Sequence, residues 1–223
     1  MIFEKFLPTA LWEEGHTLAW ELLTSVTYPW EALAMIKETV IRTGRNLPRD
    51  EYEEIAENVW AAKDASVAAS AHIGAPTIIG HGTEIRHCAF IRGSALIGNE
   101  CVVGNSTELK NAILFDRVQV PHFNYVGDSI LGFRSHMGAG AITSNVKSDK
   151  SHVTLREGGN LLDTGLKKFG AMLGDGVEVG CNSVLNPGTV IGRNASVYPL
   201  SFVRGYVPSD SIYKRLGEVC EKR

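Results

Sequence analysis

Hydrophobic residues recur every six positions along most of this chain. The period holds from Val67 to Met137, with two steps shortened to five, and it resumes from Leu173 to Val203. A period of six fits neither an α-helix nor a single amphipathic strand. It predicts short strands that turn a corner every sixth residue, with the hydrophobic side chains inside. The nineteen positions are Val67, Ile73, Ile79, Ile85, Ile91, Ile97, Val103, Leu109, Leu114, Val120, Val126, Leu131, Met137, Leu173, Val179, Leu185, Ile191, Val197 and Val203.

Small residues accompany this repeat. The side chain two positions before each hydrophobic residue is usually small, as at Ala71, Thr83 and Ala95, and glycine often follows it, as at Gly74 and Gly98. Such residues suit crowded corners. A chain of this kind buries its core only between stacked coils. With three repeats to a coil, the nineteen positions predict an all-β solenoid of about six coils.

The remaining segments lack the period. Residues 1–60 predict a short helical extension, with helices near 18–23, 28–44 and 50–60; Pro29 lies in the first turn of the second helix and Gly44 past its end. The repeat stops between Asn145 and Gly170, which predicts a loop insertion at about 146–170 on one face. Residues 209–223 predict a short polar tail with one or two helical turns. The solenoid is therefore expected at 61–208.

Composition narrows the class of protein. Hydrophobic residues make up 44% of the 223 residues, and the mean hydropathy is -0.03. There is no apolar run of the roughly 18 residues needed to span a membrane, and no apolar signal segment at the start. Four cysteines without a C-x-x-C pair favour free thiols in the cytoplasm. The lack of a basic run speaks against nucleic-acid binding.

Two cations replace the small residue that follows a repeat position. Arg92 follows Ile91 and Lys110 follows Leu109, and they lie 18 residues apart, which is one full coil. They should therefore stack on one edge of adjacent coils. Two cations so close repel each other, and a bound phosphate dianion would relieve that repulsion. Two solvated surface cations are the alternative.

A histidine and a tyrosine interrupt the repeat in the stretch V-P-H-F-N-Y-V-G-D. His122 and Tyr125 follow Pro121, which stands where glycine is usual, and we expect them near the edge that carries the two cations. Histidine is the natural general base near neutral pH. The Tyr125 phenol is suited to a phosphate or a sugar, and Asn145, where the loop leaves the repeat, to an amine or a hydroxyl group.

These motifs resemble a known family. The six-residue repeat resembles the hexapeptide-repeat acyltransferases, which form left-handed parallel β-helices. The stretches E-L-K, H-F-N-Y-V-G-D and G-A-G-A-I-T-S-N resemble the acetyltransferase half of the bifunctional N-acetylglucosamine-1-phosphate uridyltransferases. The later L-D-T-G-L-K-K-F-G-A-M-L-G-D and the earlier Y-P-W-E-A-L resemble archaeal-type two-domain sugar-1-phosphate nucleotidyltransferases. The resemblance covers about residues 28–204.

The resemblance implies a function and roles for individual residues. His122 would take a proton from the amine of an amino-sugar 1-phosphate such as glucosamine 1-phosphate. Arg92, Lys110 and Tyr125 would bind the sugar phosphate, and Asn145 the sugar. Acetyl-CoA would be the acyl donor, in a groove between the subunits of a homotrimer. The cofactor residues would be Ala139, Cys181 and Pro199, with Arg204 as a candidate for the CoA phosphates. No metal is required for the transfer.

The chain also departs from this pattern, which leaves alternatives open. His136 and Ser151 stand where the bacterial enzymes have asparagine and lysine, and Cys181 and Pro199 where they have serine and alanine. Residues 1–60 are too short for a nucleotidyltransferase domain, so uridylyl transfer is not expected. A non-catalytic trimer that binds a sugar phosphate, or a partner subunit of a separate nucleotidyltransferase, is the main alternative. A zinc-dependent γ-type carbonic anhydrase, with ligands among His81, His87, His122 and His136, is the other.

Overall fold

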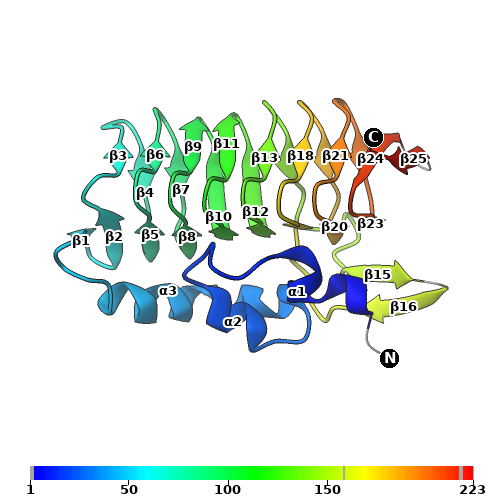
Figure 1. Cartoon of the computed structure of the whole chain (residues 1–223), viewed down its shortest axis with the longest axis horizontal. Helices are drawn as coiled ribbons and strands as arrows, with labels where there is room; N and C mark the ends of the chain where they lie inside the picture. Colours follow the sequence, from blue (N-terminus) through cyan, green and yellow to red (C-terminus); the bar gives the residue numbers. More distant parts are fainter. Residues whose placement is uncertain (1–2, 158, 216–217, 223) are drawn as a thin grey trace.

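The chain folds into a three-sided β-solenoid with a helical segment packed along one side (Figure 1). The computed structural model describes residues 3–157, 159–215 and 218–222. Parallel strands from successive coils stack into three faces. Two faces contain eight stacked strands each within the described chain, so the solenoid has about eight coils, not the six expected. The predicted hexapeptide-repeat β-helix is otherwise confirmed.

Each complete coil contributes one short strand, or half of a long one, to each face of the solenoid. Face 1 stacks β2 (Val59–Ala62), β5 (Thr77–Ile79), β8 (Ala95–Ile97), the second halves of β10 (Glu108–Leu114) and β12 (Tyr125–Leu131), β17 (Ala171–Leu173), β20 (Thr189–Ile191) and β23 (Tyr206–Val207). Face 2 stacks β3 (Ser66–Val67), β6 (Glu84–Ile85), β9 (Val102–Asn105), β11 (Gln119–His122), β13 (His136–Met137), β18 (Glu178–Val179), β21 (Ser196–Val197) and β24 (Ser211–Arg215). Face 3 stacks β4 (His72–Ile73), β7 (Phe90–Ile91), the first halves of β10 and β12, β14 (Ile142–Thr143), β19 (Val184–Leu185) and β22 (Phe202–Val203).

The repeat positions fill the interior of the solenoid. All but two of the nineteen are at most 3% exposed; the exceptions, Val67 and Ile73, lie in the first coil. The small residues that precede them, such as Thr83 and Ala95, are buried as well. Thr143 occupies the next interior position, where the aliphatic period stops. It is buried and pairs with Leu185, an interior residue of the next coil. The hydrophobic period thus sets both the fold and its phase.

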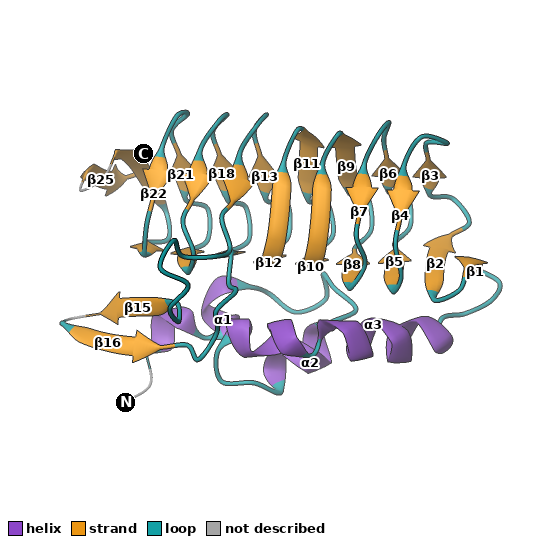
Figure 2. Cartoon of the chain, turned by 180° about the vertical axis from the view of Figure 1, so that it is seen from behind, coloured by secondary structure: helices purple, strands orange, loops and turns teal. Residues whose placement is uncertain are grey.

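The two five-residue steps change one corner of the solenoid. At Leu109–Leu114 and Val126–Leu131 the corner is shortened, so β10 and β12 run as single seven-residue strands across two faces (Figure 2). Their registers pair Lys110 with Gly127 and Ala112 with Ser129. The residues between, Asn111 and Asp128, adopt the left-handed conformation, with φ of 49° and 47°. The shortened corner therefore places the side chains of two successive coils next to each other.

The N-terminal segment covers face 1 and runs along the prism from its last coils to its first (Figure 1). It contains η1 (Glu4–Phe6), α1 (Pro8–Leu11), α2 (Trp20–Thr24), η2 (Pro29–Ala34) and α3 (Ile36–Arg45). Phe6 packs on Tyr206, and the Trp12 indole donates to the Leu173 carbonyl at 2.7 Å. Buried side chains of these helices belong to the same core as the solenoid. The predicted helical extension is thus an integral side of the fold.

The structure corrects several expectations about the flanks. Residues 50–60 do not form a helix; β1 (Tyr52–Ala56) pairs antiparallel with β2, the first strand of face 1. Their acidic residues lie on an exposed strand and not on a helical surface. Gly44 lies inside α3 and not past its end. A glycine is required there because the Trp60 ring packs where a side chain would be. The C-terminal tail adds the last strand of face 2, β24, and the antiparallel β25 (Glu218–Glu221) in place of helical turns.

The insertion after Asn145 is an ordered excursion. It contains a hairpin of β15 (Thr154–Glu157) and β16 (Asn160–Asp163) and returns to the solenoid at Phe169, whose N–H donates to the Asn145 carbonyl at 2.9 Å. The hairpin lies on the same side of the prism as the N-terminal helices (Figure 1). In the described part of the chain, no helix is long and apolar enough to cross a membrane.

Candidate functional site

The predicted site residues lie on two edges that border face 3. We call the edge between faces 2 and 3 the His122 edge; it carries His87, Asn105, His122, Ala139, Cys181 and Pro199. Successive N–H groups beside these residues donate to the carbonyls of His87, Asn105, His122, Ala139 and Cys181, which fixes their stacking. We call the edge between faces 3 and 1 the Lys110 edge; it carries Arg92, Lys110, Gly127, Ser144 and Arg204. His122 is therefore one edge away from the two cations, not on their edge.

The H-F-N-Y stretch forms a rigid corner at the His122 edge. The Asn124 side chain is 2% exposed; its amide donates to the carbonyls of Gly138 and Ala141, and its oxygen accepts from the His122 N–H at 3.1 Å. Pro121 has no backbone N–H, so it leaves no donor without a partner at this corner. The His122 side chain is exposed and, within the described chain, makes no side-chain hydrogen bond. Its backbone is thus fixed while its imidazole is open to a ligand.

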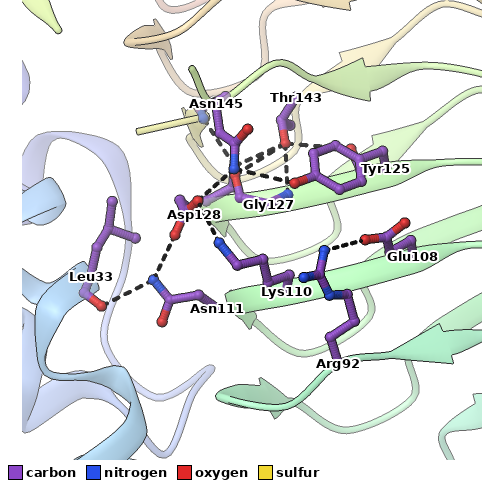
Figure 3. Close-up of polar contacts among 12 residues, drawn as sticks. Leu33, Arg92, Glu108, Lys110, Asn111, Tyr125, Gly127, Asp128, Thr143 and Asn145 are labelled. Carbon is purple, nitrogen blue, oxygen red and sulfur yellow. Dashed lines mark hydrogen bonds and ion pairs between the residues drawn. The ribbon is translucent and has the colours of Figure 1, made fainter. Parts of the chain in front are cut away.

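A polar cluster occupies the shortened corner of the Lys110 edge (Figure 3). Asp128 is 5% exposed and accepts from three side chains. Its Oδ2 lies 3.3 Å from Lys110 Nζ and 2.5 Å from Asn145 Nδ2, and its Oδ1 lies 2.9 Å from Asn111 Nδ2. These donors come from β10 and from the end of the coil that contains β14. Lys110 and Asn145 are therefore brought together by Asp128, a carboxylate to which the sequence analysis assigned no role.

Sequence reasoning missed Asp128 and Asn111. Asp128 belongs to the motif H-F-N-Y-V-G-D and lies 18 residues after Lys110, one residue more than the 17-residue coil that pairs Lys110 with Gly127. The usable signal was the five-residue step, because a shortened corner leaves a polar residue where a turn residue is usual. Asn111 lies 17 residues before Asp128 for the same reason. Their partnership depends on the local register, which the period alone does not give.

Arg92 forms an ion pair with Glu108. The Arg92 Nη1 atom lies 2.9 Å from Glu108 Oε1, and both side chains are partly exposed. Lys110 likewise has its own carboxylate, Asp128. The repulsion expected between stacked Arg92 and Lys110 is thus offset within the chain. A phosphate at this edge would share or displace Glu108, an exchange that costs little for an exposed ion pair.

Tyr125 lies on face 3 between the two edges and points toward the Lys110 cluster (Figure 3). Its hydroxyl accepts from Asn145 Nδ2 at 3.2 Å, and its ring occupies the space next to Gly127, where any side chain would overlap it. Burial, followed by the charges of Asp128 and Glu108, raises the pKa of Tyr125 above its ordinary value. The phenol is therefore protonated at neutral pH and can donate a hydrogen bond.

The four residues expected at the cofactor fall on both edges. Ala139, Cys181 and Pro199 stack on the His122 edge beyond His122 itself, and the Cys181 side chain is exposed. Arg204 does not join them; it follows Val203 on the Lys110 edge, and its guanidinium lies 5.6 Å from the centre of the Phe202 ring. Lys214 and Arg215, assigned only to a polar tail, extend the His122 edge past Pro199, since Tyr213 pairs with Val197.

The histidines do not gather into a metal site. His81 contacts Asp64 and Glu51, while His136 contacts Glu178 on face 2. His87 and His122 share an edge but are two coils apart. Among the residues described, no three or more histidine, cysteine or acidic side chains form a group that would hold a metal ion. The geometry thus offers no support for a zinc site among these four histidines.

Comparisons with known proteins place the chain in a family. It is 34% identical over 119 residues to a protein named bifunctional protein GlmU of Methanococcus vannielii, covering 53% of this chain and 28% of that protein. It is 32% identical over 109 residues to a bifunctional sugar-1-phosphate nucleotidylyltransferase/acetyltransferase of Sulfurisphaera tokodaii, covering 49% and 27%. The chain therefore spans little more than a quarter of the length of these relatives.

Solved structures resemble the chain more distantly. A putative acetyltransferase of Bacillus cereus has 16% identity and a TM-score of 0.37, covering 73% of this chain and 81% of that one. The acetyltransferase domain of PglB from Neisseria gonorrhoeae, solved with acetyl coenzyme A, has 13% identity and a TM-score of 0.34, covering 68% and 52%. Likenesses of this degree say nothing about ligands. Residues 85–207, more than half of the chain, match the family described as the GMPPB C-terminal domain, and the chain belongs to this family.

Proposed function

We propose that this protein transfers an acetyl group from acetyl-CoA to the amine of an amino-sugar 1-phosphate, glucosamine 1-phosphate or a close analogue. The observation that carries the proposal is the exposed imidazole of His122 on a rigid corner, with Ala139 and Cys181 stacked beyond it on the same edge and the Lys110 cluster across face 3. The names of the relatives, which combine sugar-1-phosphate nucleotidylyl transfer with acetyl transfer, support it.

His122 acts as the general base. A protonated amine cannot attack a thioester, so the amine proton must be removed as the new C–N bond forms. Imidazole is suited to this at neutral pH. The nitrogen attacks the thioester carbonyl, the C–S bond breaks, and CoA leaves as the thiol, which takes up the proton. Holding amine and thioester together at the His122 edge supplies most of the remaining rate enhancement.

The Lys110 edge binds the sugar phosphate. Lys110 and Arg92 supply positive charge, Tyr125 supplies a neutral donor, and Asn145 contacts the sugar. Ala139, Cys181 and Pro199 line the path of acetyl-CoA, and Lys214 and Arg215 are better placed on that edge than Arg204 for its phosphates. The transfer needs no metal.

A homotrimer in the cytoplasm is part of the proposal. Face 3 is free of the N-terminal helices and carries exposed aromatic side chains at Phe90 and Phe202. Tyr125 and Ile142 lie between them at the same outward position of the coils. Exposed apolar surface of this kind indicates an interaction face. Two further copies of the chain would cover it and complete the groove for acetyl-CoA.

A thiol-release assay tests the proposal. Wild-type protein is incubated with acetyl-CoA and a panel of hexosamine 1-phosphates, beside His122→Ala and the control His87→Ala, which removes an exposed histidine two coils away on the same edge. We expect turnover with at least one sugar, a loss of at least a hundredfold in His122→Ala, and unchanged activity in His87→Ala. No turnover with any sugar, or an unaffected His122→Ala, would overturn the proposal.

A non-catalytic sugar-phosphate-binding trimer, or a partner subunit of a separate nucleotidyltransferase, is the second candidate. It is favoured by one observation: Cys181 and Pro199 stand at the expected acyl-donor positions, where the enzymes that the chain resembles have serine and alanine. Binding of a hexosamine 1-phosphate by the wild type, without any thiol release from acetyl-CoA, would favour this candidate over the enzyme.

A further inference from the structure

We infer that the N-terminal segment is a working part of the Lys110 cluster, and that Asn111 is the positioning residue through which it acts. Asn111 is not among the residues that are proposed to bind the substrate. It joins the backbone of η2 to Asp128, which in turn holds Lys110 and Asn145 (Figure 3). The inference rests on the proposed function for its effect on substrate binding, and on the contacts alone for its effect on the cluster.

The first contact is a hydrogen bond that crosses from the N-terminal segment to the solenoid. Asn111 Nδ2 donates to the Leu33 carbonyl at 3.1 Å and to Asp128 Oδ1 at 2.9 Å. One amide nitrogen carries two hydrogens, so both bonds can be made at once. The Leu33 carbonyl is at the end of η2 and is fixed by that helix packing on β12. The orientation of the Asn111 amide, and through it that of Asp128, is thus set from outside the solenoid.

The second contact reaches the cluster from the other side. Trp30 of η2 is 1% exposed and stacks on Phe169, with ring centres 5.5 Å apart. Phe169 is where the insertion returns, and its N–H donates to the Asn145 carbonyl. The next residue, Gly170, donates its N–H to the Asp128 carbonyl at 2.8 Å. The same short helix therefore reaches Asp128 through the Asn111 amide, and Asn145 through the ring of Phe169.

Together these contacts give the cluster its geometry. A buried carboxylate with three side-chain donors holds them only while each donor keeps its direction. If Asn111 loses its amide, Asp128 keeps Lys110 and Asn145 but is free to turn, because its Oδ1 has lost its side-chain donor. Asn145 and Lys110 would then move with it. The effect should fall on the sugar phosphate, which the cluster binds, and not on acetyl-CoA, which lies on the other edge.

Asn111→Gly tests this. Glycine accepts the φ of 49° at this position and removes only the side chain. Asn194→Gly is the matched control: Asn194 has a φ of 56°, and its Nδ2 donates to Asp210 Oδ1 at 3.0 Å, outside both edges of the site. The cost of an added glycine in the unfolded chain is similar in the two variants. Both are compared with the wild-type full chain.

Two readouts decide the inference. The first is the pair of KM values: we expect about a tenfold rise in KM for the sugar phosphate in Asn111→Gly, with KM for acetyl-CoA matching that of Asn194→Gly. The second is hydrogen exchange, which needs no substrate. Backbone amides of residues 126–131 and 143–147 should exchange faster in Asn111→Gly than in the control.

The outcomes separate this inference from the proposed function. If the wild type acetylates no hexosamine phosphate, the proposed function fails, and the exchange measurement still decides whether Asn111 holds the cluster. Equal exchange in the two glycine variants would overturn the positioning role. So would a rise in both KM values together, because that pattern indicates a general loss of folded protein.

Discussion

At the scale of single residues, the charge of the candidate site is balanced within the chain. Lys110 is 25% exposed and pairs with Asp128, which is nearly buried, whereas Arg92 and Glu108 form a more open pair. Ion pairs near the surface contribute little to stability, but a buried carboxylate that loses its cation keeps an unpaired charge. The two cations therefore differ in their structural roles even though they occupy equivalent positions.

Lys110→Met should accordingly destabilise the protein more than Arg92→Met. We expect Lys110→Met to lower the free energy of unfolding by about 1–2 kcal/mol, because Asp128 is left with amide donors only. Arg92→Met should have a clearly smaller effect, since water solvates Glu108. Urea unfolding of both variants measures this. An equal loss of unfolding free energy in the two variants would contradict the conclusion that Asp128 is a buried carboxylate that depends on Lys110.

The four cysteines should differ strongly in reactivity. Burial raises the pKa of the Cys101 thiol from 9.0 to about 12, while Cys88 and Cys181 are exposed. The raised pKa means that ionisation of Cys101 opposes folding, and that this loss of stability begins only as the pH rises above the ordinary thiol value. At pH 8 we expect alkylation of Cys88 and Cys181 in the folded protein, and of Cys101 only after unfolding. Mass-spectrometric mapping of the labelled peptides would show the order.

The sequence could predict Arg92, Lys110, His122, Tyr125 and Asn145 as candidates, because each is a chemically active residue at or next to a corner of a regular repeat. It could not predict their partners. Asp128 and Asn111 come together through the shortened corner, and Asn111 also contacts the backbone of η2, 78 residues earlier. A period predicts which residues stack in adjacent coils, but not which part of a distant helix contacts them.

At the scale of elements, the solenoid was predictable and its ends were not. The six-residue period needs only the hydrophobic positions, and these are buried as expected. The segment at 50–60, which predicts a helix, is rich in glutamate. It forms β1 instead, where Tyr52 is buried and the following acidic residues face solvent on an edge strand. Pairing with β2 overrides the weak helical preference of such residues.

The His122 edge offers a test of the cofactor path at this scale. Cys181 and Cys88 are both exposed on or beside this edge, but they are four coils apart. If acetyl-CoA lies along Ala139, Cys181 and Pro199, saturating acetyl-CoA should slow alkylation of Cys181 at least severalfold and leave Cys88 unchanged. Equal protection of both thiols, or of neither, would remove the acyl donor from this part of the edge.

At the scale of the whole molecule, the three faces have different surroundings. The N-terminal segment covers face 1, polar side chains such as His136 and Glu178 lie on face 2, and exposed aromatic residues lie on face 3. Face 3 also lies between the two edges that carry the candidate site residues. Association through this face would therefore bring the sites of neighbouring copies together.

The aromatic residues of face 3 should control the oligomeric state. Light scattering of the wild type should give the mass of three chains. Phe90→Asp and Phe202→Asp, at sites 44% and 46% exposed, should shift the protein toward monomers. Leu161→Asp is the control, because Leu161 is 61% exposed on the hairpin of the insertion. A monomeric wild type, or trimers in both phenylalanine variants, would contradict the role of face 3.

The central claim is that His122 makes this chain an acetyltransferase, and the most direct test follows the acetyl group itself. Isotopically labelled acetyl-CoA is mixed with the amino-sugar 1-phosphate and with wild-type, His122→Ala or His87→Ala protein, and the sugar product is analysed by mass spectrometry. We predict labelled N-acetyl product from the wild type and His87→Ala, and at least a hundredfold less from His122→Ala. Label that stays on CoA with every sugar tested, or that reaches the sugar equally well without His122, would contradict the account.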